Sequence, residues 1–296
     1  RASEISEDSK KSFLNIVNGS GSFEDKEKAM RKIPAYKSVF DKVYPSLRTA
    51  QTEILTVKEK KSPAEISLLA KHVVNGDTTS EVLSNEELLY AATLTPSLKE
   101  KEGIYIAASK KEGSWVAHNN LATVYLQMAA QNGDDMAKNI QDALTQLDIA
   151  SNKADHVEVH ANRGTALMMQ ASYQESFEAL STAVSGATGD LKEALNASIG
   201  SIHIRMGDYE KASAALAAAD DSEVANFNRG LAHLLGDNFD GANREFNKIN
   251  NSSSLSAHAA YYLAVTAARS NNESGIMSNL KAAVSIDVAL KEKALN

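Results

Sequence analysis

Residues 200–219, GSIHIRMGDYEKASAALAAA, contain the pattern that decides the fold. Gly200 is a small residue in an apolar stretch, the run Gly207-Asp208-Tyr209 follows it, and Ala212, Leu216 and Ala219 come next. Steps of four and three residues place these last three on one helix face. Gly and Asp are typical of a helix end and of the next helix start. The stretch therefore predicts two helices packed across a tight turn, with Gly200 allowing their close approach.

The same pattern recurs along the chain, which indicates a repeat protein. The residues in the place of Gly200 are small and are separated by 30 to 42 residues: Ala122, Gly164, Gly200, Gly230 and Ala264. The residues in the place of Leu216 are large and apolar: Leu147, Leu180, Leu216, Phe246 and Leu280. A second turn, Gly236-Asp237-Asn238-Phe239, is expected to use its glycine as the helix cap. Because one helix pair cannot bury its apolar face alone, the units are expected to stack.

Composition supports an all-helical chain and excludes several function classes. All four prolines lie before residue 97, and hydrophobic residues make up 43% of the 296 residues. The absence of cysteine excludes disulfides and thiolate metal sites. The net charge of -7 argues against nucleic acid as a partner, and no apolar run is long enough for a transmembrane segment. Since the chain starts at Arg1 without Met, we expect it to be part of a longer protein.

Two segments carry a resemblance to a known family. Residues 118–125, HNNLATVY, resemble the first-helix signature of the tetratricopeptide (TPR) repeat, and residues 207–212, GDYEKA, resemble its turn into the second helix. The resemblance covers about five units within residues 114–296, although no unit has the family's closing proline. It implies an all-α fold, a right-handed α-solenoid of stacked helix pairs, whose first helices line a concave groove.

Residues 58–113 are expected to form a linker with degenerate helix pairs. Ser62 with Glu65 and Ser84 with Glu87 have the spacing of capping boxes, which predicts helices over about 63–74 and 85–94. Pro96 favours the start of a third helix that runs to about residue 110.

Residues 1–57 have a different pattern, with helices predicted at about 7–17 and 23–44 and one strand at 48–57. The turn YPSLR at 44–48 and the strand after it resemble the tail of OmpA-like domains, which some Gram-negative outer-membrane proteins join to TPR repeats. This resemblance implies a remnant of such a domain and a location in the periplasm or at the outer membrane, with the cytoplasm as the alternative. Peptidoglycan would then be a further partner, bound through a domain outside this chain.

The sequence contains no catalytic constellation, and we expect no enzyme activity, no cofactor and no metal. His156 and His160 are four residues apart, but only one carboxylate is nearby, so they are interpreted as helix-start residues. His203 and His233 stand at the repeat position of Tyr125, which indicates packing between helices.

The expected function is a non-catalytic scaffold of the Gram-negative cell envelope that binds a protein or peptide in the groove. Few lysines are present there, which argues against a clamp for acidic C-terminal peptides and suits apolar anchors. Core packing between helices is the alternative for several groove residues. A glycan-binding envelope protein is the other function considered, although Trp115 is the only tryptophan for stacking on sugars. The groove positions implied by the family are Asn119, Thr123, Leu126, Glu158, Thr165, Met168, Ser201, Ile204, Arg205, Phe227, Leu231, Leu234, His258, Tyr261, Val265 and Arg269.

Overall fold

The computed structural model describes residues 5–44, 60–111, 114–131 and 135–295. Within these ranges every regular element is helical and there is no strand. The chain divides into two compact units, residues 1–60 and residues 61–296. Across the described ranges, no helix combines the length and the apolar character that crossing a bilayer requires.

The N-terminal unit contains the helices α1 (Glu7–Asn18), α2 (Phe23–Met30) and α3 (Tyr36–Lys42). The prediction of one helix over 23–44 was wrong, because residues 31–35 separate α2 from α3. Pro34 lies in this break; it has no backbone N–H and disfavours helical geometry in the residue before it. The strand predicted at 48–57 lies outside the described residues.

The second unit starts with α5 (Pro63–Asn75), the short 3-10 helix η1 (Ser80–Val82), α6 (Asn85–Thr93) and α7 (Leu98–Ser109). Both predicted capping boxes are confirmed. The Glu65 carboxylate accepts from the Ser62 backbone N–H at 2.7 Å, and Glu87 accepts from that of Ser84 at 2.8 Å. The three helices predicted from this stretch are therefore present within one or two residues of their expected bounds.

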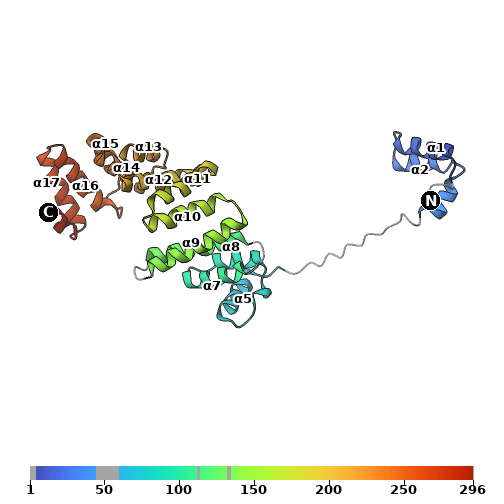
Figure 1. Cartoon of the computed structure of the whole chain (residues 1–296), viewed down its shortest axis with the longest axis horizontal. Coiled ribbons are helices and arrows are strands. Elements are labelled where there is room, and N and C mark those ends of the chain that lie inside the picture. The colour runs from blue at the N-terminus through green and yellow to red at the C-terminus, as the bar shows by residue number, and fades with distance from the viewer. Residues whose placement is uncertain (1–4, 45–59, 112–113, 132–134, 296) are drawn as a thin grey trace. The chain divides into compact units, whose positions relative to one another are not determined.

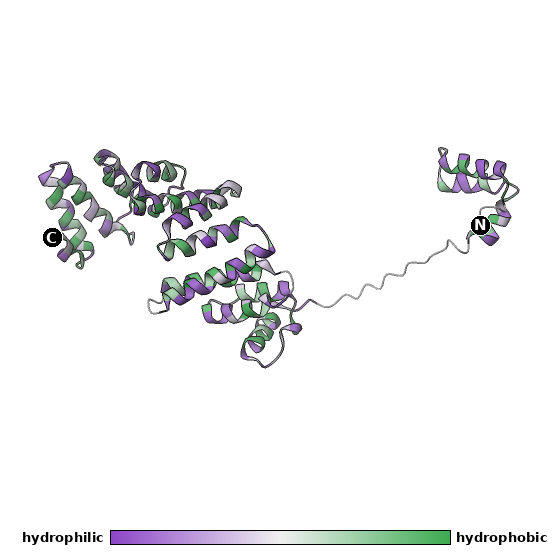
Figure 2. Ribbon diagram, viewed as in Figure 1, coloured by the Kyte–Doolittle hydropathy of each residue, from purple (hydrophilic) through white to green (hydrophobic). Residues whose placement is uncertain are grey.

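The repeats follow as helix pairs that stack on one another along residues 115–286 (Figure 1). The first helices of the five pairs are α8 (Trp115–Gln131), α10 (Val157–Met169), α12 (Gly189–Met206), α14 (Glu223–Leu235) and α16 (Ser256–Arg269). The second helices are α9 (Met136–Lys153), α11 (Tyr173–Gly186), α13 (Tyr209–Ala217), α15 (Phe239–Phe246) and α17 (Glu273–Ile286), and α18 (Leu290–Leu295) comes last. Hydrophobic and hydrophilic stretches alternate along each helix (Figure 2), as expected where one face packs on neighbours.

Within the second, third and fourth pairs a glycine of the first helix lies directly beneath a large residue of the second helix. A Cβ at Gly164 would come within 2.5 Å of Leu180, and one at Gly230 within 2.6 Å of Phe246. Leu147, Leu180 and Phe246 are at most 1% exposed. The small-to-large contact predicted from the sequence is confirmed in these three pairs, and the predicted all-α solenoid is confirmed as well.

The turn between the two helices uses one left-handed residue at the same repeat position in four units: Ala171, Gly207, Asp237 and Asn271. Gly236 is the C-cap of α14, as expected, but it has a φ of -90°, and the left-handed residue of this turn is Asp237 after it, with a φ of 60°. Asn238 caps α15 as predicted, its side chain accepting from the Gly241 N–H at 3.0 Å. Asp208 makes no such cap and pairs with Lys211 at 3.1 Å instead.

Candidate functional site

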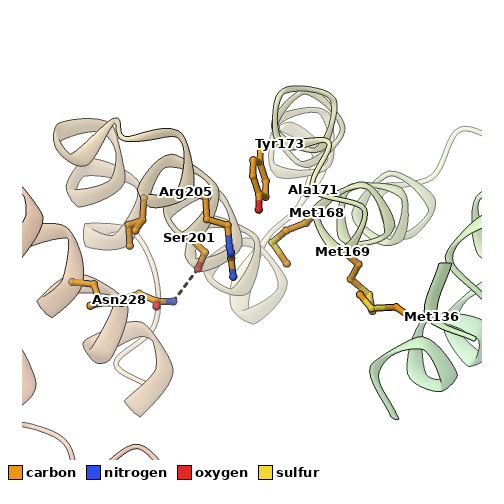
Figure 3. Close-up of a pocket in the computed structure, with 10 residues that line it drawn as sticks. Met136, Met168, Met169, Ala171, Tyr173, Ser201, Arg205 and Asn228 are labelled. Carbon is orange, nitrogen blue, oxygen red and sulfur yellow. Dashed lines mark hydrogen bonds between the residues drawn. The ribbon is translucent and has the colours of Figure 1, made fainter. Parts of the chain in front are cut away.

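A groove of about 630 Å³ lies across the first helices of the second, third and fourth repeats. Residues of α10, α12 and α14 line it, together with the turn before α11 and the start of α9 (Figure 3). Its lining residues are Met136, Met168, Met169, Ala171, Tyr173, Ser201, Ile204, Arg205, Asn228 and Leu231. Arg205 is the one charged residue among them.

Methionines make up one part of this groove. Met136 and Met169 pack against the core of the first two repeats, and Met168 packs against the core between the second and third. All three side chains are only half-buried, so each also faces the groove. Methionine is flexible and polarisable, which allows this surface to adapt to apolar side chains of different shape.

A cation and an aromatic ring form the next part of the groove. The guanidinium carbon of Arg205, on α12, lies 5.9 Å from the ring centre of Tyr173, on α11. The two side chains approach each other from neighbouring helices in Figure 3. A guanidinium placed over a ring in this way makes a cation–π contact and keeps its N–H groups available for other partners.

Amide side chains connect successive first helices along the same face. Asn228 donates to the Ser201 hydroxyl at 2.9 Å (Figure 3). Asn162 donates to the Asn119 side-chain oxygen at 2.9 Å and to the Thr123 hydroxyl at 3.2 Å. These bonds fix the spacing of neighbouring repeats and therefore the shape of the groove floor.

The structure brings five of the predicted groove residues together in this groove, namely Met168, Ser201, Ile204, Arg205 and Leu231. Leu126 and Leu234 are 7% and 2% exposed and belong to the core, which favours the alternative of packing between helices. Phe227 is half-buried, and its ring centre lies 5.6 Å from that of Phe246. A helix inside a stack has apolar residues on more than one face, so periodicity alone does not separate groove from core.

The other predicted positions lie along the first helices but outside this groove. Asn119 is buried, and its side-chain oxygen accepts a hydrogen bond from Asn162. Thr123 and Thr165 are half-buried, and their hydroxyls donate to backbone oxygens of their own helices. Glu158 is exposed; His258 and Tyr261 are half-buried, and Arg269 is exposed and bonded to the preceding repeat. A ligand role for these residues stays a prediction.

The sequence reasoning missed five groove residues, namely Met136, Met169, Ala171, Tyr173 and Asn228. A signal existed for two of them. Tyr173 occupies the aromatic position that starts the second helix, as Tyr209 and Phe239 do, and Asn228 occupies the position of Asn120. Met136 follows no repeat position. Met169 stands at the repeat position of Arg205, but only its placement in space identifies it as a groove residue.

His156 and His160, the two histidines four residues apart, are engaged in ring packing and in a local pair. The ring of His156 stacks on Trp115 at 3.8 Å, and His160 lies 2.6 Å from a carboxylate oxygen of Asp155. No group of three or more metal-ligating side chains assembles within the described ranges.

The shared position of Tyr125, His203 and His233 is a packing position, as predicted. Burial, reinforced by Glu102 and Asp142, raises the pKa of Tyr125 to about 12. Burial also lowers the pKa of both imidazoles. His203 is 6% exposed, and its ring lies 5.0 Å from that of Phe177.

Comparison with solved structures identifies the fold. The chain is similar to YrrB, described as a TPR protein with an unusual peptide-binding site, at 17% identity and a TM-score of 0.52, covering 64% of this chain and 94% of YrrB. It is similar to PilW, a type IV pilus biogenesis factor, at 17% identity and a TM-score of 0.51, covering 79% and 96%. A TPR protein from Parabacteroides merdae matches at 16% identity and a TM-score of 0.52, covering 71% and 89%.

No protein-family model matches the chain, and no curated protein matches its sequence. The structural similarities identify a TPR-type α-solenoid. None of the comparisons supports the resemblance of the N-terminal segment to an OmpA-like domain.

Proposed function

We propose that residues 61–296 are a non-catalytic scaffold that binds a peptide segment of a partner protein in the groove across α10, α12 and α14. The observation that carries this proposal is the composition of the groove, in which flexible apolar side chains surround a few polar groups. Binding sites for extended segments combine apolar pockets with a small number of oriented hydrogen-bonding groups. The fold shared with YrrB, whose description names a peptide-binding site, supports the same function.

The proposed setting is the Gram-negative cell envelope, either the periplasm or the outer membrane. Two observations support it: the resemblance of residues 1–57 to an OmpA-like tail, and the shared fold with PilW, a type IV pilus biogenesis factor. In this setting the scaffold would hold its partner beside the cell wall. The division of the chain into a short N-terminal segment, a linker and about five repeats belongs to the same proposal.

Glycan binding is the weaker candidate. Sugar sites use exposed aromatic faces, and His156 covers one face of the Trp115 ring at 3.8 Å. Trp115 also packs against the core of the first two repeats. A ring held in this way has little free surface for stacking on a sugar.

Site-specific photocrosslinking tests the proposal. A photoreactive amino acid in place of Met168 lies in the groove, whereas one in place of Val224, which is 60% exposed on α14, lies outside it. Crosslinked segments identified by mass spectrometry in an envelope extract are expected from position 168 and not from position 224. Equal crosslinking at both positions, or none at position 168, contradicts the proposed site.

A further inference from the structure

Two arginines occupy the same position in different repeats. Arg205 follows Gly200 by five residues, and Arg269 follows Ala264 by five. Each guanidinium stacks on the aromatic residue that starts the second helix of the preceding repeat. The distances from guanidinium carbon to ring centre are 5.9 Å for Arg205 over Tyr173 and 5.5 Å for Arg269 over Phe239.

Within the described residues, one of these two arginines has a carboxylate beside it and the other has none. Arg269 donates to the Asp237 carboxylate at 2.6 Å and to the Leu234 carbonyl at 3.1 Å. Asp237 is the left-handed residue of the turn in its repeat, and Ala171 is the left-handed residue at the matching position before Arg205. Alanine has no carboxylate, and within the described part of the chain no acidic side chain pairs with Arg205.

We infer that a carboxylate of the bound segment takes, beside Arg205, the place that Asp237 holds beside Arg269. This inference rests on the proposed peptide-binding function and specifies its ligand. The segment carries an aspartate or glutamate next to an apolar side chain, and the apolar side chain packs on Met168 and Met169. Arg205 is the one charge lining the groove, so it is the group there that selects for an acid.

The acid belongs to a side chain within the segment. Arg205 is on α12, with Met168 and Met169 of α10 to one side and Asn228 and Leu231 of α14 to the other. A segment that crosses the groove therefore continues past Arg205 in both directions. The chain as a whole has a net charge of -7, so the preference for an acid arises from this short-range pair and not from long-range attraction.

The sequence alone favours apolar anchors and argues against a clamp for acidic C-terminal peptides, because the groove contains few lysines. Comparison of the repeats adds one requirement to that expectation. An arginine already stacked on an aromatic ring pairs with a carboxylate in favourable geometry, and charge-assisted bonds of this kind are about twice as strong as neutral ones.

Fluorescence anisotropy with the full chain tests the inference. The probes are labelled, C-terminally amidated heptapeptides from a library of Leu, Met and Ala with one central Glu, and matched peptides in which Gln replaces Glu. We expect the best Glu peptides to bind about tenfold more tightly than their Gln counterparts, and Arg205→Gln to abolish this difference.

Position 171 supplies a matched pair of variants. Ala171→Asp places a carboxylate beside Arg205 as Asp237 does beside Arg269, so the preference for Glu is expected to disappear. Ala171→Asn has the same size as Ala171→Asp, suits the left-handed backbone equally and adds no charge. Both variants change the same groove-lining residue, so the comparison is made on the ratio of Glu to Gln binding, and that ratio is expected to remain above one only in Ala171→Asn. Circular dichroism melting of both variants verifies that the repeats stay folded.

The possible results separate the inference from the function on which it rests. Equal binding of Glu and Gln peptides, or a preference that survives Ala171→Asp, overturns the inference and leaves the proposed function in place. Tighter binding of peptides that offer only a free C-terminal carboxylate overturns the assignment to a side chain. Absence of binding by every peptide contradicts the proposed function itself.

Discussion

Gly200 lies so close beneath Leu216 that a Cβ on the glycine would come within 2.4 Å of the leucine Cγ. Real carbon atoms do not approach at this distance, so either the leucine or the helix would have to move. Leu216 is fully buried and has little room to move. The contact therefore sets how near α12 and α13 approach, and its counterparts do the same in neighbouring repeats.

We expect Gly200→Ala to destabilise the solenoid by about 1–2 kcal/mol. Overpacking a core lowers the free energy of unfolding by about 1–3 kcal/mol. The higher helix propensity of alanine offsets up to about 1 kcal/mol of this loss. Thermal and urea unfolding followed by circular dichroism measure the change.

The double variant Gly200→Ala with Leu216→Ala provides the control, because the smaller side chain makes room for the added methyl group. Its loss of stability is expected to be smaller than the sum of the two single losses. Additive losses contradict the direct contact.

The fold could be predicted from the sequence because the contact between Gly200 and Leu216 recurs at a fixed spacing. The groove could be predicted only in part. The family pattern implied Met168, Arg205 and Leu231, whereas Met136 has no repeat position and Met169 was not distinguished from core by its position. Leu234 looks like a groove residue by position, and only the stacking of repeats buries it. The break between α2 and α3 was also missed. The apolar periodicity of residues 23–44 predicts one continuous helix, whereas Pro34 interrupts it.

The bond between Asn228 and Ser201 is expected to contribute about 0.5–1.5 kcal/mol of coupling between the third and fourth repeats. A double-mutant cycle of Asn228→Ala and Ser201→Ala, evaluated by urea unfolding, measures it.

Thr165 and Ser198 occupy the equivalent positions one repeat earlier, but their hydroxyls donate to Ala161 and Ala194 of their own helices. The same cycle on this pair is expected to give a coupling near zero. Equal coupling in the two cycles contradicts a specific role for the amide.

Glycine is expected to be favourable at position 171 and alanine unfavourable at position 207. Ala171 has a φ of 64° and Gly207 a φ of 81°, a backbone region that costs a residue with a Cβ about 1–2 kcal/mol. Ala171→Gly removes this cost but raises the conformational entropy of the unfolded chain, which opposes the gain. The net result is expected to be unchanged stability or a rise of up to about 1 kcal/mol. Gly207→Ala is expected to lower stability by about 1 kcal/mol, and differential scanning calorimetry distinguishes the two. A gain from Gly207→Ala is inconsistent with the left-handed turn.

Stability is expected to fall on mild acidification because of His203. Burial lowers the pKa of this imidazole, the nearby Asp208 raises it by a smaller amount, and Lys211 lowers it further. Its Nδ1 atom has no hydrogen-bond partner in the described part of the chain, and the carboxylate oxygen of the partly exposed Asp208 is 3.8 Å away, beyond hydrogen-bond distance. In the unfolded chain this imidazole has a pKa of about 6.5, so it binds a proton more readily there than in the folded protein. The contribution of His203 to stability is therefore fully present above that pH. It declines as the pH falls from there toward the lower pKa of the folded state. Burial lowers the pKa of His233 as well, so this residue acts in the same direction.

The midpoint of thermal unfolding, compared at pH 7.5 and pH 5.5, measures this effect. The wild-type chain is expected to lose more stability between the two values than His203→Gln, and the double variant with His233→Gln the least. Ending the series at pH 5.5 keeps the carboxylates ionised, so their protonation does not obscure the histidine contribution. An identical loss in all three proteins assigns the pH dependence to other groups and contradicts the buried, neutral state of His203.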